Sequence, residues 1–199
     1  MVHFLDVGQA HATVAINDDS ALVVDCPREG IQQATELLNK LILAHFDIIV
    51  THQDMDHCAG VQNLLQRFGT PSTILYMNPV GTPAPEQRPR VRAVLQGILS
   101  AVEDVGAKTA GADKGTVGNT GSINWSVLAP SHSQILQANL VGNVVNRLSV
   151  VVLVRIRRFT FLIPGDIDDT TARELLDSSA KLRADVFLIP HHGAKLATI

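Results

Sequence analysis

The segment from Thr51 to His57 most constrains what this chain can become. It holds four side chains that can bind a metal ion within six consecutive positions: His52, Asp54, Asp56 and His57. It follows an apolar run at 47–50 that reads as a buried strand, and a stretch at 58–68 with helical periodicity comes after it. Carboxylates and imidazoles this close would repel and lose solvation unless a cation lay between them. The segment therefore predicts a metal site between a strand and a helix, where α/β folds place their sites.

The spacing inside this segment indicates more than one ion. His52 and Asp54 are two positions apart in extended chain, so their side chains can point the same way. Asp56 and His57 follow at the turn into the helix and aim at a second point in space. We therefore expect two metals.

Hydrophobic periodicity predicts strands and helices that alternate through the first half of the chain. Strands are expected at 2–7, 12–16, 21–24, 47–50, 74–77, 123–128, 148–156, 160–163 and 185–189. Helices are expected at 30–43, 58–68, 91–106 and 169–179. The segments 78–89 and 106–121 read as loops, the second with room for a short strand, and His132 is expected in a surface loop.

Composition favours one domain over residues 1–199. A chain of 199 residues can enclose one large core, and its net charge of −3 argues against a broadly basic nucleic-acid-binding surface. No stretch approaches the roughly 20 apolar residues of a membrane helix, and we expect no signal peptide, because the first residues already read as part of the fold. With only Cys26 and Cys58 present, a disulfide framework is not indicated, and we expect a cytoplasmic protein without membrane contact.

The chain resembles the metallo-β-lactamase superfamily. The order His52-x-Asp54-x-Asp56-His57 resembles that family's His-x-His-x-Asp-His signature, with Asp at the third position. Further motifs come in the family's order and cover nearly the whole chain: Phe4-Leu5-Asp6-Val7-Gly8-Gln9, the strand ending in Asp25, Asn146-x-x-Ser149, Gly165-Asp166 and His191-His192-Gly193. They look most like the branch that includes the hydrolase domain of the DNA-uptake channel ComEC and the phosphorylcholine esterases.

The resemblance implies an α/β (α+β) fold, the four-layer αβ/βα sandwich, with the site at one edge of two sheets. It also implies two divalent metal ions, with a hydroxide that bridges them attacking the substrate. One ion would be held by His52, Asp54 and one of His191 and His192, and the other by Asp56 and His57. Asp166 would bridge the two, and Asp56 and Asp166 would be the catalytic carboxylates. The oxygen-rich ligand set makes zinc or manganese suitable, with magnesium as a further option.

Four other residues are implied as support for the site or as substrate contacts. Asp25 would support it by hydrogen bonding, although it could equally cap a turn. Asn146 would orient substrate or water, with Ser149 in the same element, and Lys195 would contact a phosphate. His11 stands where the family has Asp, and we interpret it, like His3, as structural or solvated. Cys26 and Cys58 read as packing residues.

The family pattern is incomplete at the carboxyl end. The branch continues beyond His-His-Gly with another strand and a Gly-His-Pro element, whereas this sequence ends at Ile199. The resemblance then implies a sandwich that lacks its last strand and helix, and a metal at Asp56 and His57 that lacks one ligand. We interpret the sequence as a fragment; the alternative is a split protein completed by a partner chain.

The resemblance implies a metal-dependent phosphodiesterase or nuclease acting on DNA. Two cations suit this chemistry, because each can stabilise one developing oxyanion. The alternatives are a hydrolase of a small phosphodiester or other ester, and a catalytically weak interaction module completed by a partner.

Overall fold

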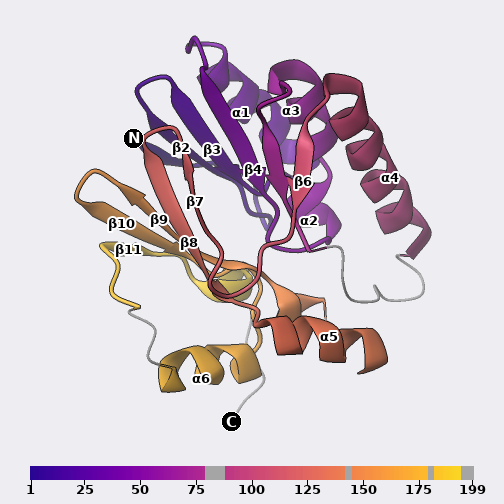
Figure 1. The fold of residues 1–199 in the computed structure, drawn as a ribbon, viewed down its shortest axis with the longest axis vertical. Helices are drawn as coiled ribbons and strands as arrows, with labels where there is room; N and C mark the ends of the chain where they lie inside the picture. Colours follow the sequence, from indigo (N-terminus) through magenta and orange to yellow (C-terminus); the bar gives the residue numbers. More distant parts are fainter. Residues whose placement is uncertain (79–87, 142–144, 179–181, 194–199) are drawn as a thin grey trace.

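Two β-sheets lie face to face with helices outside them, as the computed structural model shows (Figure 1). The structure describes residues 1–78, 88–141, 145–178 and 182–193. The first sheet has the order β1-β2-β3-β4-β5-β6, formed by Val2–Phe4, Thr13–Asn17, Ser20–Val24, His45–Ile49, Ile74–Tyr76 and Lys108–Ala110. The second has the order β11-β10-β9-β8-β7, formed by Val186–Phe187, Phe159–Ile163, Val151–Ile156, Ile123–Ala129 and Val117–Thr120.

The helices connect and cover these sheets. They are η1 (Arg28–Gly30), α1 (Ile31–Leu38), α2 (Met55–Cys58), α3 (Val61–Phe68), α4 (Arg88–Val105), α5 (His132–Val141), η2 (Asn146–Leu148), α6 (Asp169–Asp177) and η3 (Pro190–Gly193). In Figure 1, α1, α3 and α4 lie on the outer side of the first sheet, and α5 and α6 lie near the lower end of the second. The expected αβ/βα sandwich is confirmed.

Strand alternation divides the apolar residues into three layers. In β3, Ala21 and Val23 face the helices, whereas Leu22 and Val24 face the other sheet. The layer between the sheets also takes Trp125 and many branched residues from β8, β9 and β10. A third, smaller layer packs α6 on the outer face of the second sheet, through Ala129, Val151, Leu162, Ile167 and Leu175. The first sheet is thus covered on both faces, whereas α6 covers one end of the outer face of the second.

The helix α5 begins at His132, which was expected in a loop, and the segment 106–121 contains two strands, β6 and β7, where a loop with room for one short strand was expected. The apolar residues of α5 do not recur on one face, so periodicity misses it. A capping box was the available signal: the Ser131 amide donates to Gln134 Oε1 (2.6 Å), and the Gln134 amide donates to Ser131 Oγ (3.3 Å). The strands β6 and β7 depend on pairing with β5 and β8. In β7, Gly118 also packs against Trp125 of β8, since a Cβ at this glycine would lie 2.2 Å from the indole ring. Such contacts are tertiary, so local pattern does not reveal them.

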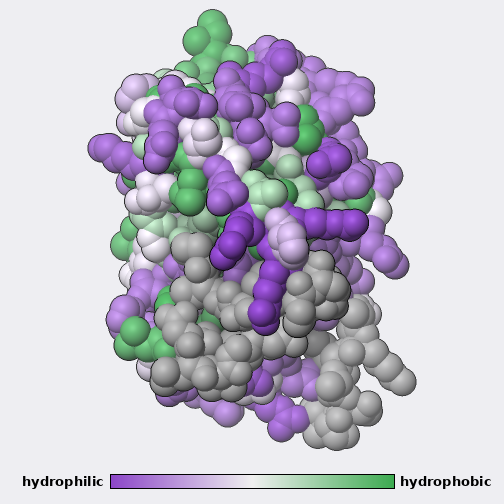
Figure 2. Space-filling model, turned by 90° about the vertical axis from the view of Figure 1, so that its right-hand side faces the viewer, coloured by the Kyte–Doolittle hydropathy of each residue, from purple (hydrophilic) through white to green (hydrophobic). Residues whose placement is uncertain are grey.

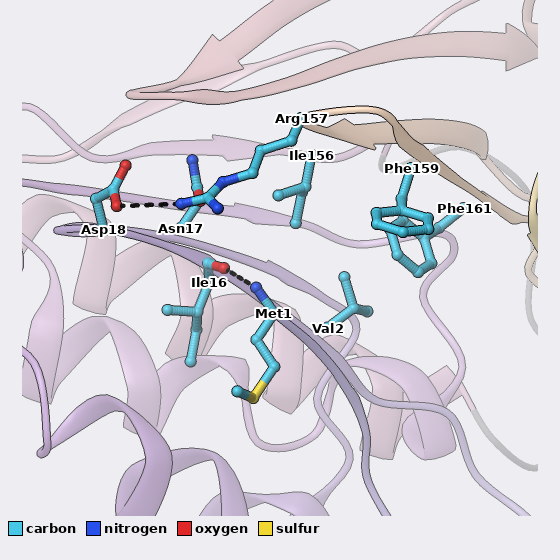
Figure 3. Close-up of a pocket in the computed structure, with 9 residues that line it drawn as sticks. All are labelled: Met1, Val2, Ile16, Asn17, Asp18, Ile156, Arg157, Phe159 and Phe161. Carbon is cyan, nitrogen blue, oxygen red and sulfur yellow. Dashed lines mark hydrogen bonds and ion pairs between the residues drawn. The ribbon is translucent and has the colours of Figure 1, made fainter.

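A cavity of about 440 Å³ lies at the β2–β3 and β9–β10 turns (Figure 3). These turns are at the opposite end of β3 and β10 from the metal-ligand motifs. The apolar floor of the cavity includes Ile156 and Phe161, and its rim carries Asp18 and Arg157, whose charged atoms are 3.9 Å apart. It is therefore separate from the predicted metal site.

Surface character differs between two parts of the molecule. Figure 2 views the side that carries α4, where hydrophilic side chains dominate and hydrophobic ones are scattered. The edge strand β11, in contrast, exposes Val186 and Phe187, and Ile189 follows it with 71% of its surface exposed. Among the helices in the described ranges, none has both the length and the apolar character that crossing a bilayer requires.

Candidate metal centre

Four strand ends bring the predicted ligands to one edge of the sandwich. Asp25 follows β3 directly, and the segment from His52 to His57 follows β4, which runs parallel to β3. Asp166 follows β10, and the histidine pair in η3 follows β11, which runs parallel to β10. Because parallel neighbours end at the same edge, sequence-distant side chains meet there.

His57 lies at the centre of this group and is fully buried. Its Nδ1 is 2.7 Å from Asp25 Oδ2, and its Nε2 is 3.3 Å from Asp166 Oδ1. Burial opposes protonation, but the Asp25 charge and hydrogen bonds to Asp166 and Asp25 outweigh it and raise the pKa of His57 to about 10. Without a metal, the imidazole is therefore held as a cation between two carboxylates.

The first group of donors surrounds His57 Nε2. It consists of Asp56, His57, Asp166 and His192, each with a ligand atom within 4.8 Å of the others. His192 Nε2 lies 3.3 Å from His57 Nε2, 3.4 Å from Asp166 Oδ2 and 3.6 Å from Asp56 Oδ2. Ligands at about 2.1 Å around a tetrahedral ion are about 3.4 Å apart, so the spacing suits a cation. The sequence expectation left Asp56 and His57 short of a ligand, whereas here His192 lies with them.

The second group is formed around His52. Its Nε2 is buried without a hydrogen-bond partner among the described residues, with Asp54 Oδ2 at 3.6 Å and Asp166 Oδ2 at 3.9 Å. A buried ring nitrogen without a partner is unfavourable unless an ion or water binds it. His191 Nε2 is also 3.9 Å from Asp166 Oδ2. Asp166 Oδ1 thus lies beside the first group, and its Oδ2 lies near histidines of both groups.

Asp25 forms hydrogen bonds with Thr51 and His57. Its Oδ1 accepts the Thr51 amide (2.7 Å), and its Oδ2 accepts the Thr51 hydroxyl (2.7 Å) and His57 Nδ1. Burial alone would raise the pKa of Asp25, but the charge of His57 and hydrogen bonds from His11 and His57 hold it far below its usual range. The Thr51 hydroxyl is also 3.1 Å from His52 Nδ1. The sequence analysis assigned Thr51 no role. Its position, as a polar residue between a buried strand and the predicted ligand His52, could have indicated one.

Ser149 and Gly165 position Asp166. Ser149 Oγ accepts the Asp166 amide at 3.1 Å. Gly165 has φ +58, and a Cβ there would lie 2.9 Å from Thr51 Cβ and 3.0 Å from Ser149 Cβ. Glycine therefore lets the chain pass between these side chains and turn toward the ligands.

The site residues include three backbone outliers. Asp25, His191 and His192 have φ of 59, 50 and 52, in the left-handed region that residues with a Cβ rarely adopt. Such strain persists where surrounding contacts hold it and gathers at functional sites. It marks these residues independently of any motif.

The remaining predicted residues have varied positions. Asn146 begins η2, where its carbonyl accepts the Ser149 amide, and Lys195 lies outside the described residues. His132 is exposed, and both cysteines are fully buried, as expected. His3 lies in β1, whereas His11 lies beside Asp25, with its Nδ1 at 2.9 Å from Asp25 Oδ2.

The donors fit divalent cations. They combine imidazole nitrogens with carboxylate oxygens, a set that zinc, manganese and magnesium accept. Burial would raise the pKa of Asp166, but His57, by hydrogen bond and charge, holds it low, with His52 and His192 contributing. Asp166 therefore stays ionised and available to a metal. Carboxylate and imidazole donors therefore lie together at a partly exposed edge of the sandwich, where a cation can bind.

Two sequence comparisons agree with this geometry. The sequence profile described as the Metallo-beta-lactamase superfamily matches residues 5–106. The chain is also 22% identical over 151 residues to ComE operon protein 3 of Bacillus subtilis (strain 168). That match covers 76% of this chain but only 17% of the Bacillus protein.

Solved structures with the same fold are dissimilar in sequence. MEM-A1, a subclass B3 metallo-beta-lactamase from a soil metagenome library, matches with a TM-score of 0.57 and 11% identity, covering 92% of this chain and 73% of that one. GOB-18 from Elizabethkingia meningoseptica has a TM-score of 0.52 and 12% identity, with 90% and 69% covered. Zinc-bound PqqB from Methylobacterium extorquens has a TM-score of 0.50 and 14% identity, with 82% and 56% covered. At this identity the likeness concerns the fold alone.

Proposed function

Because the chain belongs to the metallo-β-lactamase superfamily, we propose that it is a metal-dependent hydrolase of phosphodiesters with two divalent ions at the candidate centre. The observation that carries the proposal is the position of Asp166. Its Oδ1 lies 3.3 Å from His57 Nε2, while its Oδ2 lies 3.4 Å from His192 Nε2 and 3.9 Å from His52 Nε2. One carboxylate therefore serves two groups of donors.

Each ion has its own donors in this proposal. The first would be held by Asp56, His57 and His192, and the second by His52, Asp54 and His191. When bound, divalent ions lower the pKa of water toward about 7 and neutralise charge that develops on a phosphodiester. Zinc and manganese suit this mixed set, and magnesium is a further option.

The protein's own residues supply orientation and proton handling. Asp25 binds His57 Nδ1 and so directs Nε2 toward the ligands. Asp56 is 45% exposed at its side chain, so it can hold a proton from attacking water while it remains beside His192. Asp166, at 6% exposure, keeps its charge inside the centre.

DNA is the substrate that we propose first. The resemblance of the motifs to the DNA-uptake channel favours it, and the match to ComE operon protein 3 supports the same branch. A small phosphodiester is the second candidate, because the ligand set does not depend on polymer length. An interaction module without chemistry is the third; the convergence of Asp56, His57, Asp166 and His192, with His52 beside Asp166, argues against it, since binding alone does not require them.

Two substrates separate these candidates. Protein loaded with zinc or manganese is incubated with single-stranded DNA and with bis-p-nitrophenyl phosphate. Cleavage of DNA supports the first candidate, and cleavage of the small ester alone supports the second. Cleavage of neither, in protein shown to contain metal, would support the interaction module instead.

Substitution of Asp56 tests the assigned centre. Asp56→Ala should lower phosphodiesterase activity at least about 100-fold, because loss of a ligand exceeds the roughly 10–100-fold effect of supporting residues. Its thermal unfolding in the metal-free state should change little, since the side chain is 45% exposed. Asp104→Ala, which alters an exposed carboxylate in α4, is the matched control. Turnover by Asp56→Ala equal to that of the control would contradict the role.

A further inference from the structure

His11 is held in one orientation beside the metal centre. It lies in the segment between β1 and β2, where its side chain is 14% exposed and its amide donates to the Asp56 carbonyl at 3.2 Å. Its Nδ1 is 2.9 Å from Asp25 Oδ2, and its Nε2 is 3.0 Å from Thr13 Oγ1. Both ring nitrogens are therefore engaged, and the ring cannot rotate without breaking two hydrogen bonds.

The partners determine the roles of the two nitrogens. A neutral imidazole has one donor and one acceptor nitrogen. Asp25 is an acceptor, so Nδ1–H donates to it, and Nε2 accepts the Thr13 hydroxyl. Asp25 Oδ2 then receives three hydrogen bonds, from His11, from the Thr51 hydroxyl and from His57 Nδ1.

A role as a metal ligand fits His11 less well. One donor atom each from His11, Asp25 and His57 lie within 4.8 Å of one another. However, the Thr51 hydroxyl donates to the same Asp25 oxygen at 2.7 Å, and the nitrogens that face it form hydrogen bonds of ordinary length. These donors satisfy one another without an ion.

We propose that His11 is a positioning residue of the metal centre, which acts through Asp25 on His57. By donating to Oδ2, His11 holds the Asp25 carboxylate in the orientation that directs His57 Nε2 toward Asp166 and His192. Partners of this kind fix the ring orientation of a ligand, and their loss lowers metal affinity. The inference rests on the metal centre of the proposed function.

Metal affinity, rather than activity, is the measurement that tests this role. The wild-type protein and its variants are titrated with Zn²⁺ in competition with a chromogenic chelator, well below their unfolding temperatures. His11→Ala and His11→Leu, the second of which fills the space, should each bind Zn²⁺ about 10–100-fold more weakly. His11→Asn should recover affinity to within about threefold of wild type, because its Nδ2 offers a donor near the position of histidine Nδ1.

His132→Ala is the matched control. His132 also pairs with an aspartate, Asp113 at 3.2 Å, but its side chain is 73% exposed and in a different element. The Zn²⁺ affinity of His132→Ala should equal that of wild type. Unchanged affinity in His11→Leu, or a loss in His11→Asn as large as in His11→Leu, would overturn the positioning role alone. Absence of Zn²⁺ binding by the wild-type protein would overturn the metal centre as well, so the two failures are distinguishable.

Discussion

The ring of His57 lies between two carboxylates, with Asp25 at Nδ1 and Asp166 at Nε2. A carboxylate at each nitrogen favours the imidazolium, which explains why its pKa rises despite complete burial. An imidazole must be neutral to bind a metal ion, so an ion that binds at Nε2 replaces a proton there. His57 thus couples metal binding to pH.

The first prediction follows from this coupling. His57 titrates at about 10 in the folded protein against an ordinary 6.5, so its stabilising contribution is complete below pH 6.5. In the metal-free protein that contribution is lost as the pH rises through about 10, which a series of chemical denaturation curves would show. Metal affinity should rise over the same interval, because proton release becomes easier. Metal affinity that is independent of pH between 7 and 9 would contradict the displacement of a proton.

At the scale of elements, Asp47 joins three strands. It lies in β4 with 7% of its surface exposed, and its Oδ1 accepts the Ile74 amide at the start of β5 (2.7 Å). Its Oδ2 accepts the Thr120 hydroxyl at the end of β7 (2.6 Å), so it also links the two sheets. Burial raises the pKa of Asp47, and the hydrogen bonds from Thr120 and Ile74 offset only part of this effect.

Two substitutions at Asp47 should therefore have opposite effects. Asp47→Asn keeps an acceptor for Ile74 and a donor for Thr120 without burying charge, so its free energy of unfolding should equal or exceed that of wild type at pH 7. Asp47→Ala leaves both partners unsatisfied and should lower it by about 1–3 kcal/mol for each buried group.

The raised pKa of Asp47 also predicts how the stability difference between Asp47→Asn and wild type changes with pH. A carboxyl whose folded pKa is raised loses stabilising effect as the pH increases through that value, whereas asparagine does not titrate. The advantage of Asp47→Asn should therefore grow from pH 4 to pH 8 in urea denaturation. Asp104→Asn, at an exposed position, is the control. If the free energies of unfolding of Asp47→Asn and wild type differed by the same amount across this range, the buried charge of Asp47 would not destabilise the folded protein.

At the scale of the whole molecule, the two sheets supply the ligands jointly. His52 to His57 follow a strand of the first sheet, and Asp166 and the histidine pair follow strands of the second. The sheets are also joined at this edge by the Val150 amide, which donates to the Thr51 carbonyl at 2.8 Å. A bound ion would therefore link the two halves of the sandwich.

Metal removal should accordingly lower the unfolding temperature. A metal ion whose free concentration is about 100 times its Kd stabilises a folded protein by about 2.7 kcal/mol. Differential scanning calorimetry should show a higher unfolding temperature with Zn²⁺ than after treatment with a chelator. The shift in unfolding temperature should be smaller for Asp56→Ala. An identical unfolding temperature in both states would mean that no ion bridges the sheets.

The sequence predicted the fold wherever one element carries its own pattern. Apolar runs at β3 and β4 and periodicity in α3 predicted these elements, the family resemblance implied the layers, and the four-layer fold is confirmed. It missed α5, which has no apolar face, and it allowed one short strand where β6 and β7 form, since both strands depend on pairing with other strands. Ligand assignments made from the sequence remain predictions.

By itself, the sequence determined which residues can bind cations and that several of them follow one buried strand, because ligand chemistry and hydrophobic pattern are local. Only the tertiary structure decided which donors meet: His192 with Asp56 and His57, and His11 and Thr51 with Asp25. These contacts join residues up to 135 positions apart. They depend on how parallel strands of two sheets end at a common edge, and no local spacing encodes that arrangement.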